Sequence, residues 1–247
     1  MKKIVILSGL IITLLTYIFY SYSDSKVIKI GLVAGLSGKY SSLGTDVRNG
    51  VVLAFEDINF QANGMKFELI QKDDKQNKDE AKKIINEFIK DEVKVVIGNS
   101  TSSMTKISLE SINKNKDVML ISATASSDDF SFKKDNFIRT QVANNSLKFD
   151  SFSKYIKEHS SGNIITIYDP NNLSYSKGYI GNFQKAYMKN GGNAFVDSLE
   201  ITLPYEQIKE KIQSNNANTI LIVANSIDSA KLIQYLKLNK LNKVILC

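Results

Sequence analysis

Residues 95–108 read VVIGNSTSSMTKIS, and residues 118–127 read VMLISATASS. In each stretch a run of apolar residues, typical of a strand buried in a parallel sheet, ends abruptly in small hydroxyl residues. Ligands of open α/β sheets bind outside the carboxyl ends of the strands, where loops and helix N-termini present donors. The sequence therefore predicts a polar pocket for a small ligand. The hydroxyl clusters are Ser100, Thr101, Ser102 and Ser103 after the first strand, and Ser122, Thr124, Ser126 and Ser127 after the second.

Helix capping is the alternative explanation of these hydroxyls, because serine and threonine are preferred residues at helix N-termini. Capping alone explains a single cluster readily. Two clusters at the ends of consecutive strands, with no histidine, cysteine or carboxylate within either, favour a binding site without catalysis.

The rest of the chain alternates predicted strands and helices joined by short polar turns. Residues 47–59 and 79–90 carry apolar residues at helical spacing, in the second case at Ala81, Ile84, Ile85 and Phe88. Repeated strand–helix units with nearly continuous apolar strands predict an α/β fold built from doubly wound parallel sheets. The rhythm breaks at residues 141–146, QVANNS, which predicts one lobe over residues 26–142 and a second over residues 143–247.

Composition narrows the possible functions. The chain has 247 residues, 43% of them hydrophobic and 23% charged, as in folded globular proteins. The net charge is +7, but the lysines are scattered among acids without a basic stripe, so no nucleic-acid binding is predicted. The chain has one cysteine, Cys247, so no intrachain disulfide and no cysteine-based metal site can form. With one histidine, His159, the sequence predicts no zinc site and no histidine-based triad with a cysteine nucleophile.

No cofactor is predicted either. Gly31, Gly35 and Gly38 match a dinucleotide-binding motif only loosely, because Gly31 falls inside the first predicted strand. Tyr205 and Lys209 have the Y-x-x-x-K spacing of short-chain dehydrogenases, but Pro204 places them at the start of a helix in the second predicted lobe.

Residues 1–25 form a separate segment. Lys2 and Lys3 precede an apolar run over residues 4–20, and polar residues follow, which is the layout of a secretory signal peptide. The run is also nearly long enough to serve as an uncleaved membrane anchor. Both alternatives predict a periplasmic or other extracytoplasmic location, either free or anchored to the inner membrane by residues 4–20.

Several segments carry a family resemblance. They include LAFEDIN at 53–59, VVIGNSTSSMT at 95–105, LISATASS at 120–127 and IYDPNNLSYSKG at 167–178, together with Gly38, Gly44 and Gly50. In these segments the chain resembles the type I periplasmic binding proteins of the branched-chain amino-acid (Leu/Ile/Val) family, the substrate-binding components of ABC transporters.

The resemblance implies a ligand cleft between two lobes, an amino acid or similar small polar solute as ligand, an ABC permease as partner, and no enzymatic activity. Family members continue past the equivalent of Cys247, so it also implies that the second lobe is incomplete. By position, the ligand-binding residues are Ser102, Ser103, Thr124 and Ser126 in the first lobe, and Tyr175 and Ser226 in the second.

Two other functions remain as alternatives. A membrane-anchored sensing domain of the same fold would use residues 4–20 as its anchor. An exported α/β enzyme could use Asp73 and Asp74, at a predicted strand end, as acid and base. Such a pair more often belongs to a solvated turn or a packing contact, so the enzyme is the least favoured.

Overall fold

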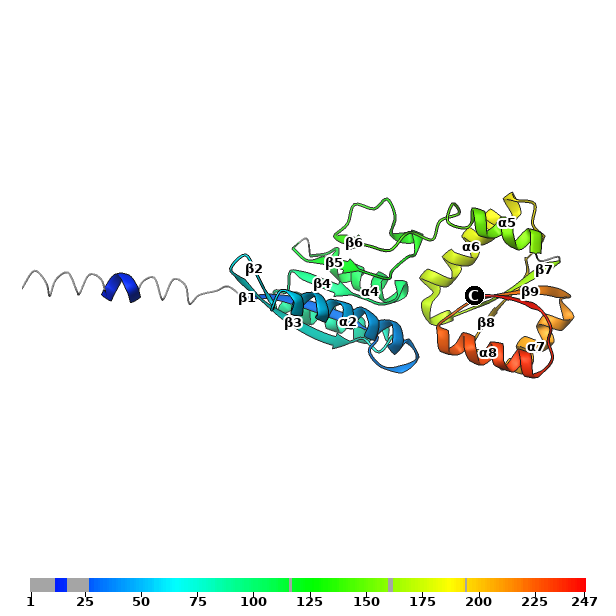
Figure 1. The fold of residues 1–247 in the computed structure, drawn as a ribbon, viewed down its shortest axis with the longest axis horizontal. Coiled ribbons are helices and arrows are strands. Elements are labelled where there is room, and N and C mark those ends of the chain that lie inside the picture. The colour runs from blue at the N-terminus through cyan, green and yellow to red at the C-terminus, as the bar shows by residue number, and fades with distance from the viewer. Residues whose placement is uncertain (1–11, 17–26, 116, 160–161, 194) are drawn as a thin grey trace, which may run out of the picture.

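The computed structural model describes residues 12–16, 27–115, 117–159, 162–193 and 195–247. Two α/β lobes lie one after the other along the long axis (Figure 1). The first contains a sheet of order β2-β3-β1-β4-β5-β6 and the second a sheet of order β10-β9-β7-β8. All strand pairs are parallel except the antiparallel pair of β2 with β3. The short strand β2 was not predicted from the sequence. The predicted fold class is therefore confirmed.

The first lobe is built from strands and helices that alternate along the chain. Its elements are β1 (Val27–Ala34), η1 (Gly38–Tyr40), α2 (Ser41–Asp57), β2 (Gln61–Ala62), β3 (Met65–Asp73), α3 (Lys78–Lys90), β4 (Val95–Gly98), α4 (Ser102–Ile112), β5 (Met119–Ser122), η2 (Asp128–Phe130) and β6 (Phe137–Arg139).

The second lobe continues the alternation. Its elements are α5 (Asp150–His159), β7 (Asn163–Tyr168), η3 (Pro170–Asn172), α6 (Leu173–Lys189), β8 (Phe195–Glu200), α7 (Tyr205–Ser214), β9 (Ala217–Val223), α8 (Ser226–Leu238) and β10 (Val244–Leu246).

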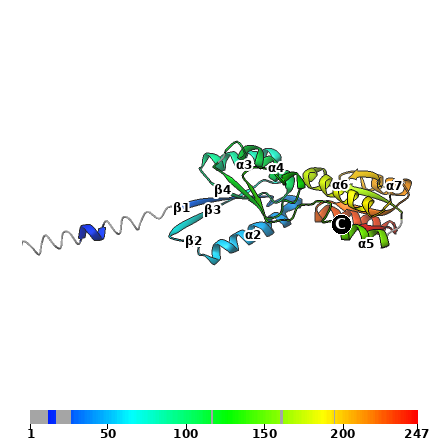
Figure 2. The same ribbon diagram turned by 90° about the horizontal axis from the view of Figure 1, so that it is seen from above.

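Helices α3 and α4 cover one face of the first sheet, and α2 lies on the other (Figure 2). The predicted apolar face of α3 is confirmed, because Ala81, Ile84, Ile85 and Phe88 are all buried. Helix α3 begins where Asn77 accepts hydrogen bonds from the backbone of Asp79 and Glu80. Burying this apolar face in the core of the lobe, with Phe88 over Gly31 of β1, is what holds the helix on the sheet.

Helix α2 starts six residues earlier than the apolar periodicity predicted, at Ser41 rather than Val47. Its first turn packs on the loop after β1 through Gly44, where an added Cβ would lie 2.0 Å from the carbonyl oxygen of Gly35. That contact needs a residue without a side chain and so leaves no apolar signal in the sequence. It brings the start of α2 close to the end of β1.

In the second lobe both faces of the sheet are covered. Helices α5 and α6 bury Phe149, Phe183 and Tyr187 on one face. Helices α7 and α8 bury the leucines and isoleucines of the other face. Alternate residues of β7 and β9 contribute to the two clusters, which is the pattern of a central parallel strand.

The segment between the lobes has less regular structure than predicted. The sequence of residues 136–143, NFIRTQVA, predicts a strand, which the structure limits to Phe137–Arg139. The sequence also predicts a helix from Ser146 to Glu158, and in the structure this helix begins at Asp150. In between, Asn144 is completely buried and its polar groups bind neighbouring segments. These local hydrogen bonds replace the ladder and helix bonds that apolar periodicity predicted.

Most of the predicted leader, residues 1–25, lies outside the described residues. Residues 12–16 form a helical turn. In the described parts of the chain, no helix combines the length and apolar character that a membrane crossing requires.

The glycines of α2 provide a matched test of the packing at β1. We expect Gly44→Ala to lower the free energy of unfolding by about 1–3 kcal/mol, because its methyl group must displace the Gly35 backbone. Gly50→Ala, on the open side of the same helix, should raise it by up to about 1 kcal/mol through helix propensity. Urea denaturation followed by circular dichroism measures both. Equal effects of the two substitutions would contradict this account of α2.

Candidate functional site

A buried polar network joins the carboxyl ends of β3, β4 and β5. Asn99 donates through Nδ2 to Asp74 Oδ2 at 2.8 Å and accepts at Oδ1 from the Ser108 hydroxyl at 2.6 Å. The backbone carbonyl of Asn99 accepts from the Ser122 hydroxyl at 3.0 Å. The other oxygen of Asp74 accepts from the backbone N–H of Gln76 at 2.8 Å. Because these groups are almost completely buried, the network fixes where the loops after the three strands begin.

Asp73 and Asp74 therefore have structural roles. Burial raises the pKa of Asp74, and both of its oxygens accept hydrogen bonds inside the network. Asp73 accepts from the backbone N–H groups of Leu36 and Lys75, both at 2.8 Å. The pair holds the loops after β1 and β3, as expected of a packing feature.

Ser102 and Ser126 both line the space between the lobes, and the hydroxyl oxygen of each accepts a hydrogen bond from a neighbouring segment. The Ser102 hydroxyl accepts from the backbone N–H of Ser127 at 3.2 Å. The Ser126 hydroxyl accepts from Nδ2 of Asn144 at 3.2 Å. In both cases the internal bond uses a lone pair, which leaves the hydroxyl proton for a ligand.

Thr124 has the opposite polarity. Its hydroxyl donates to the carbonyl oxygen of Ser100 at 2.8 Å, so its remaining lone pairs can accept from a ligand. Thr101 caps α4 by accepting from the Met104 backbone, and the positive end of this helix faces the same space. The first lobe thus offers donors, an acceptor and a helix N-terminus within one small region.

The second lobe closes this region through a polar contact with η1, which we call the latch. Lys39 forms an ion pair of 2.7 Å with Asp228, and the Tyr40 hydroxyl donates to Asp169. Asn225 donates to both carboxylates, at 2.8 Å to Asp228 and 3.4 Å to Asp169. Burial, reinforced by Asp169, raises the pKa of Tyr40, which therefore stays a donor.

A second contact joins the start of α4 to the start of α6. The backbone N–H of Ser103 donates to Asn172 at 3.1 Å, and the Ser103 hydroxyl accepts from the Ser174 backbone at 3.2 Å. Gln76 donates to the carbonyl of Asn171 at 3.5 Å. Together with the latch, these bonds hold the two lobes against each other in a closed arrangement.

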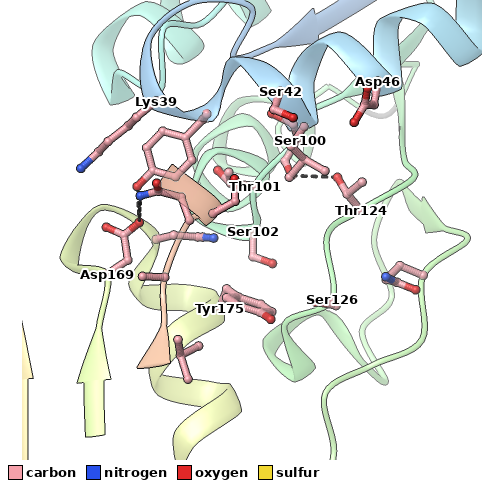
Figure 3. Close-up of a pocket in the computed structure, with 18 of the residues that line it drawn as sticks. Lys39, Ser42, Asp46, Ser100, Thr101, Ser102, Thr124, Ser126, Asp169 and Tyr175 are labelled. Carbon is pink, nitrogen blue, oxygen red and sulfur yellow. Dashed lines mark hydrogen bonds between the residues drawn. The ribbon is translucent and has the colours of Figure 1, made fainter. Parts of the chain in front are cut away.

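A cavity of about 430 Å³ lies between the lobes. Figure 3 shows Ser100, Thr101, Ser102 and Thr124 on one side of it and Asp169 and Tyr175 on the other. Five of the six predicted site residues line it: Ser102, Thr124, Ser126, Tyr175 and Ser226. The sixth, Ser103, does not line the cavity because its hydroxyl and N–H are used in the contact with α6.

Tyr175 and Ser226 are the predicted site residues of the second lobe, and they differ in burial and position. Tyr175 is half-buried, and burial raises its pKa to about 12, so its ring offers an apolar surface with a neutral hydroxyl. Ser226 is an exposed residue at the first turn of α8, beside the capping residue Asn225. Tyr175 is therefore the better placed of the two to contact a ligand's body.

The sequence interpretation missed several cavity residues, among them Lys39, Tyr40, Lys148, Asp169 and Asn225. Tyr40 and Asp169 follow the first strands of their lobes, so strand-end position was a usable signal for both. Lys148 and Asn225 are ordinary surface residue types in sequence. Among the described residues, no cluster of three or more histidine, cysteine or acidic side chains could hold a metal ion.

Comparisons with known proteins agree with this geometry. The profile of a family described as periplasmic binding protein matches residues 27–246. A leucine-, isoleucine-, valine-, threonine- and alanine-binding protein from Pseudomonas aeruginosa is 26% identical over 152 residues, which are 60% of this chain and 40% of that protein.

Solved structures show the same fold. The leucine-binding protein LivK from Thermotoga maritima matches with a TM-score of 0.79 and 18% identity, over 88% of this chain and 62% of its own. LivJ from Streptococcus pneumoniae, in complex with isoleucine, gives 0.76 and 23%, over 89% and 63%. A Rhodopseudomonas palustris solute-binding protein in complex with benzoate gives 0.77 and 17%, over 89% and 61%. This chain therefore spans less than two thirds of the length of these relatives.

Removing the centre of the buried network should destabilise the first lobe. Asn99→Ala deletes the bonds to Asp74 and Ser108 and leaves both groups buried without these partners. We expect the free energy of unfolding to fall by about 2–4 kcal/mol. Asn86→Ala, on the exposed face of α3, should change it by less than about 0.5 kcal/mol. Urea denaturation measures both, and similar losses would argue against the network.

The latch should respond to pH through Asp228. Burial acts to raise its pKa, but the bonds from Lys39 and Asn225 outweigh this and hold the pKa below its ordinary value. The stabilisation is therefore complete above the unfolded-state pKa of about 3.9 and is lost as the pH falls through the lowered folded-state pKa.

Asp228→Asn removes the charge from this partly exposed ion pair, so we expect a loss of at most about 1 kcal/mol near pH 7. The difference from the wild-type protein should shrink as the pH falls below about 3.9 and should vanish only below the lowered folded-state pKa of Asp228, where protonation removes the same charge. Urea denaturation over a series of pH values from about 7 down to about 2 is the measurement. A difference that does not depend on pH would show that the charge of Asp228 is not what stabilises the latch.

Proposed function

Because the chain belongs to the periplasmic binding protein family, we propose that it captures a small carboxylate-bearing solute, an amino acid or an aromatic acid, for an ABC importer. Family membership agrees with the prediction that the chain is not an enzyme. Among the relatives, LivJ is in complex with isoleucine and the Rhodopseudomonas palustris protein with benzoate. Both ligands carry a carboxylate, which is the part of the ligand that we assign to the first lobe.

The cavity between the lobes is the observation that carries this proposal. Its volume of about 430 Å³ suits a ligand of amino-acid or benzoate size, and both lobes contribute to its wall. A ligand held there contacts both lobes at once, so it binds the closed arrangement better than an open one. Binding therefore shifts the protein towards closure, which gives a permease a surface that reports occupancy.

The polarity of the first-lobe hydroxyls supports a place for the carboxylate. Ser102 and Ser126 can each donate a hydroxyl proton, and the N-terminus of α4 adds a partial positive charge. Thr124 can accept from an ammonium or hydroxyl group of the ligand. The ring of Tyr175 would pack against the ligand's apolar part.

Three statements about the chain remain predictions from its sequence. These are the boundary between the lobes at residues 142 and 143, the choice between signal peptide and membrane anchor, and the extracytoplasmic location. A sensing domain of the same fold remains the alternative, and the same cavity would then bind the signal molecule.

Titration calorimetry tests the proposal on the full chain, with isoleucine, glutamate, benzoate and 4-hydroxybenzoate as probes. We expect saturable binding of at least one probe. Ser102→Ala should weaken it about 10- to 100-fold, since one hydrogen bond to a charged group is lost. Ser214→Ala, on the exposed end of α7, is the matched control and should leave the affinity unchanged. If none of the four probes binds, the proposed ligand class is wrong.

A further inference from the structure

Asn144, in the segment between the lobes, uses all of its polar groups within a small region. Its backbone N–H donates to the Ser126 carbonyl at 2.8 Å, and its Nδ2 donates to the Ser126 hydroxyl at 3.2 Å. Its backbone carbonyl accepts from Asn182 of α6 at 2.7 Å, and its Oδ1 accepts from Lys148 Nζ at 2.6 Å. Asn182 also donates to Asp128 of η2 at 2.7 Å. A completely buried residue thus positions two cavity side chains, Ser126 and Lys148.

The charged groups around the cavity are unequally neutralised. Lys39 is paired with Asp228, and Asp169 accepts hydrogen bonds from Tyr40, Asn171 and Asn225. Lys148 differs from Lys39, because none of the ion pairs among the described residues includes it.

The surroundings of Lys148 keep its cation near the cavity. Its ammonium group is bonded to Asn144 and lies 5.8 Å from the centre of the Phe149 ring. Both neighbours are polar or aromatic but uncharged. The side chain of Lys148 is exposed as a whole, but partial burial of its ammonium group lowers its pKa, and no carboxylate among the described residues offsets that effect. An anionic group on a ligand would therefore supply the missing opposite charge.

We propose that Lys148 pairs with an anionic group of the bound solute and that the cavity thereby selects organic acids of net negative charge over zwitterionic amino acids. The inference rests on the proposed function, which assigns the cavity to a carboxylate-bearing solute. The two carboxylates that line the cavity in the described part of the chain differ from Lys148 in how they are held. Asp169 already accepts hydrogen bonds from three donors. Asp46 on α2 is exposed, as Lys148 is, but no hydrogen bond from the described residues orients its carboxylate, whereas Asn144 fixes the ammonium group of Lys148 beside the cavity.

Lys148 would also connect the charged group of a bound ligand to the segment between the lobes, through its hydrogen bond to Asn144. The same asparagine that holds the ammonium group is bonded to Ser126 of the first lobe and Asn182 of the second. A solute that pairs with Lys148 would therefore be tied to both lobes through one rigid connection. Loss of the cation should affect anionic ligands and leave uncharged contacts unchanged.

Titration calorimetry on the full chain tests the inference, with benzoate, succinate, glutamate and isoleucine as probes. We expect a net-anionic probe to bind most tightly and its affinity to fall as salt rises from about 0.05 M to about 0.5 M. Lys148→Met should weaken that probe about 10- to 100-fold, and Lys148→Arg should retain affinity within a few-fold. Lys154→Met, on the exposed side of α5, is the matched control and should match the wild-type protein.

The possible failures can be told apart. If isoleucine binds most tightly and Lys148→Met leaves its affinity unchanged, the charge-selection inference is wrong while the proposed function stands. If an anionic probe binds and Lys148→Met changes its affinity by less than about two-fold, Lys148 is not the pairing residue. If the wild-type protein binds none of the probes, the proposed function and the inference are both wrong. Circular dichroism of each variant checks that the fold is retained.

Discussion

The structure depends on the hydrogen bond between Asp74 and Asn99. A carboxylate that is completely buried is costly unless its oxygens are bonded, and here one oxygen accepts from Asn99 and the other from the Gln76 backbone. Asn99 in turn binds Ser108 and Ser122, so the ends of β3, β4 and β5 and the body of α4 are held as one unit. The loops that carry the cavity hydroxyls all start from this unit. Their positions follow from it rather than from contacts with a ligand.

Closure of the lobes has a different energetic character. The contacts across the gap are a partly exposed ion pair and a few polar hydrogen bonds, each of which contributes little net free energy. Each lobe has its own apolar core, and neither core crosses the gap. The lobes therefore have separate cores and are joined mainly by polar contacts. A ligand that contacts both sides can shift such an equilibrium with a modest difference in affinity.

The polar residues around the cavity have different roles in the proposed function. Ser102 and Ser126 can donate to a carboxylate and Thr124 can accept from a ligand donor, so these neutral hydroxyls do not by themselves select the net charge of a ligand. Charge selection has to come from ionic groups around them. Lys148 is placed for that role by Asn144, whereas Lys39 and Asp169 are committed to holding the lobes together. Residues that close the cavity and residues that select its ligand are therefore distinct.

The sequence alone determined the α/β class, the order of the elements and the strand ends at which Ser102, Thr124 and Ser126 lie. Buried strands and amphipathic helices leave a local pattern, and strand ends in a parallel sheet share one edge. Only the tertiary structure decided that Ser103 holds α6 instead of lining the cavity, that α2 starts at Ser41, and that Lys39 and Tyr40 meet Asp228 and Asp169. The contacts of Tyr40 with Asp169 and of Lys39 with Asp228 join residues 129 and 189 positions apart in the chain, and no local pattern encodes such contacts. The tertiary structure also distinguishes Lys148 from the other lysine of the cavity, Lys39. Among the described residues no carboxylate lies near Lys148, and only the folded surroundings decide this.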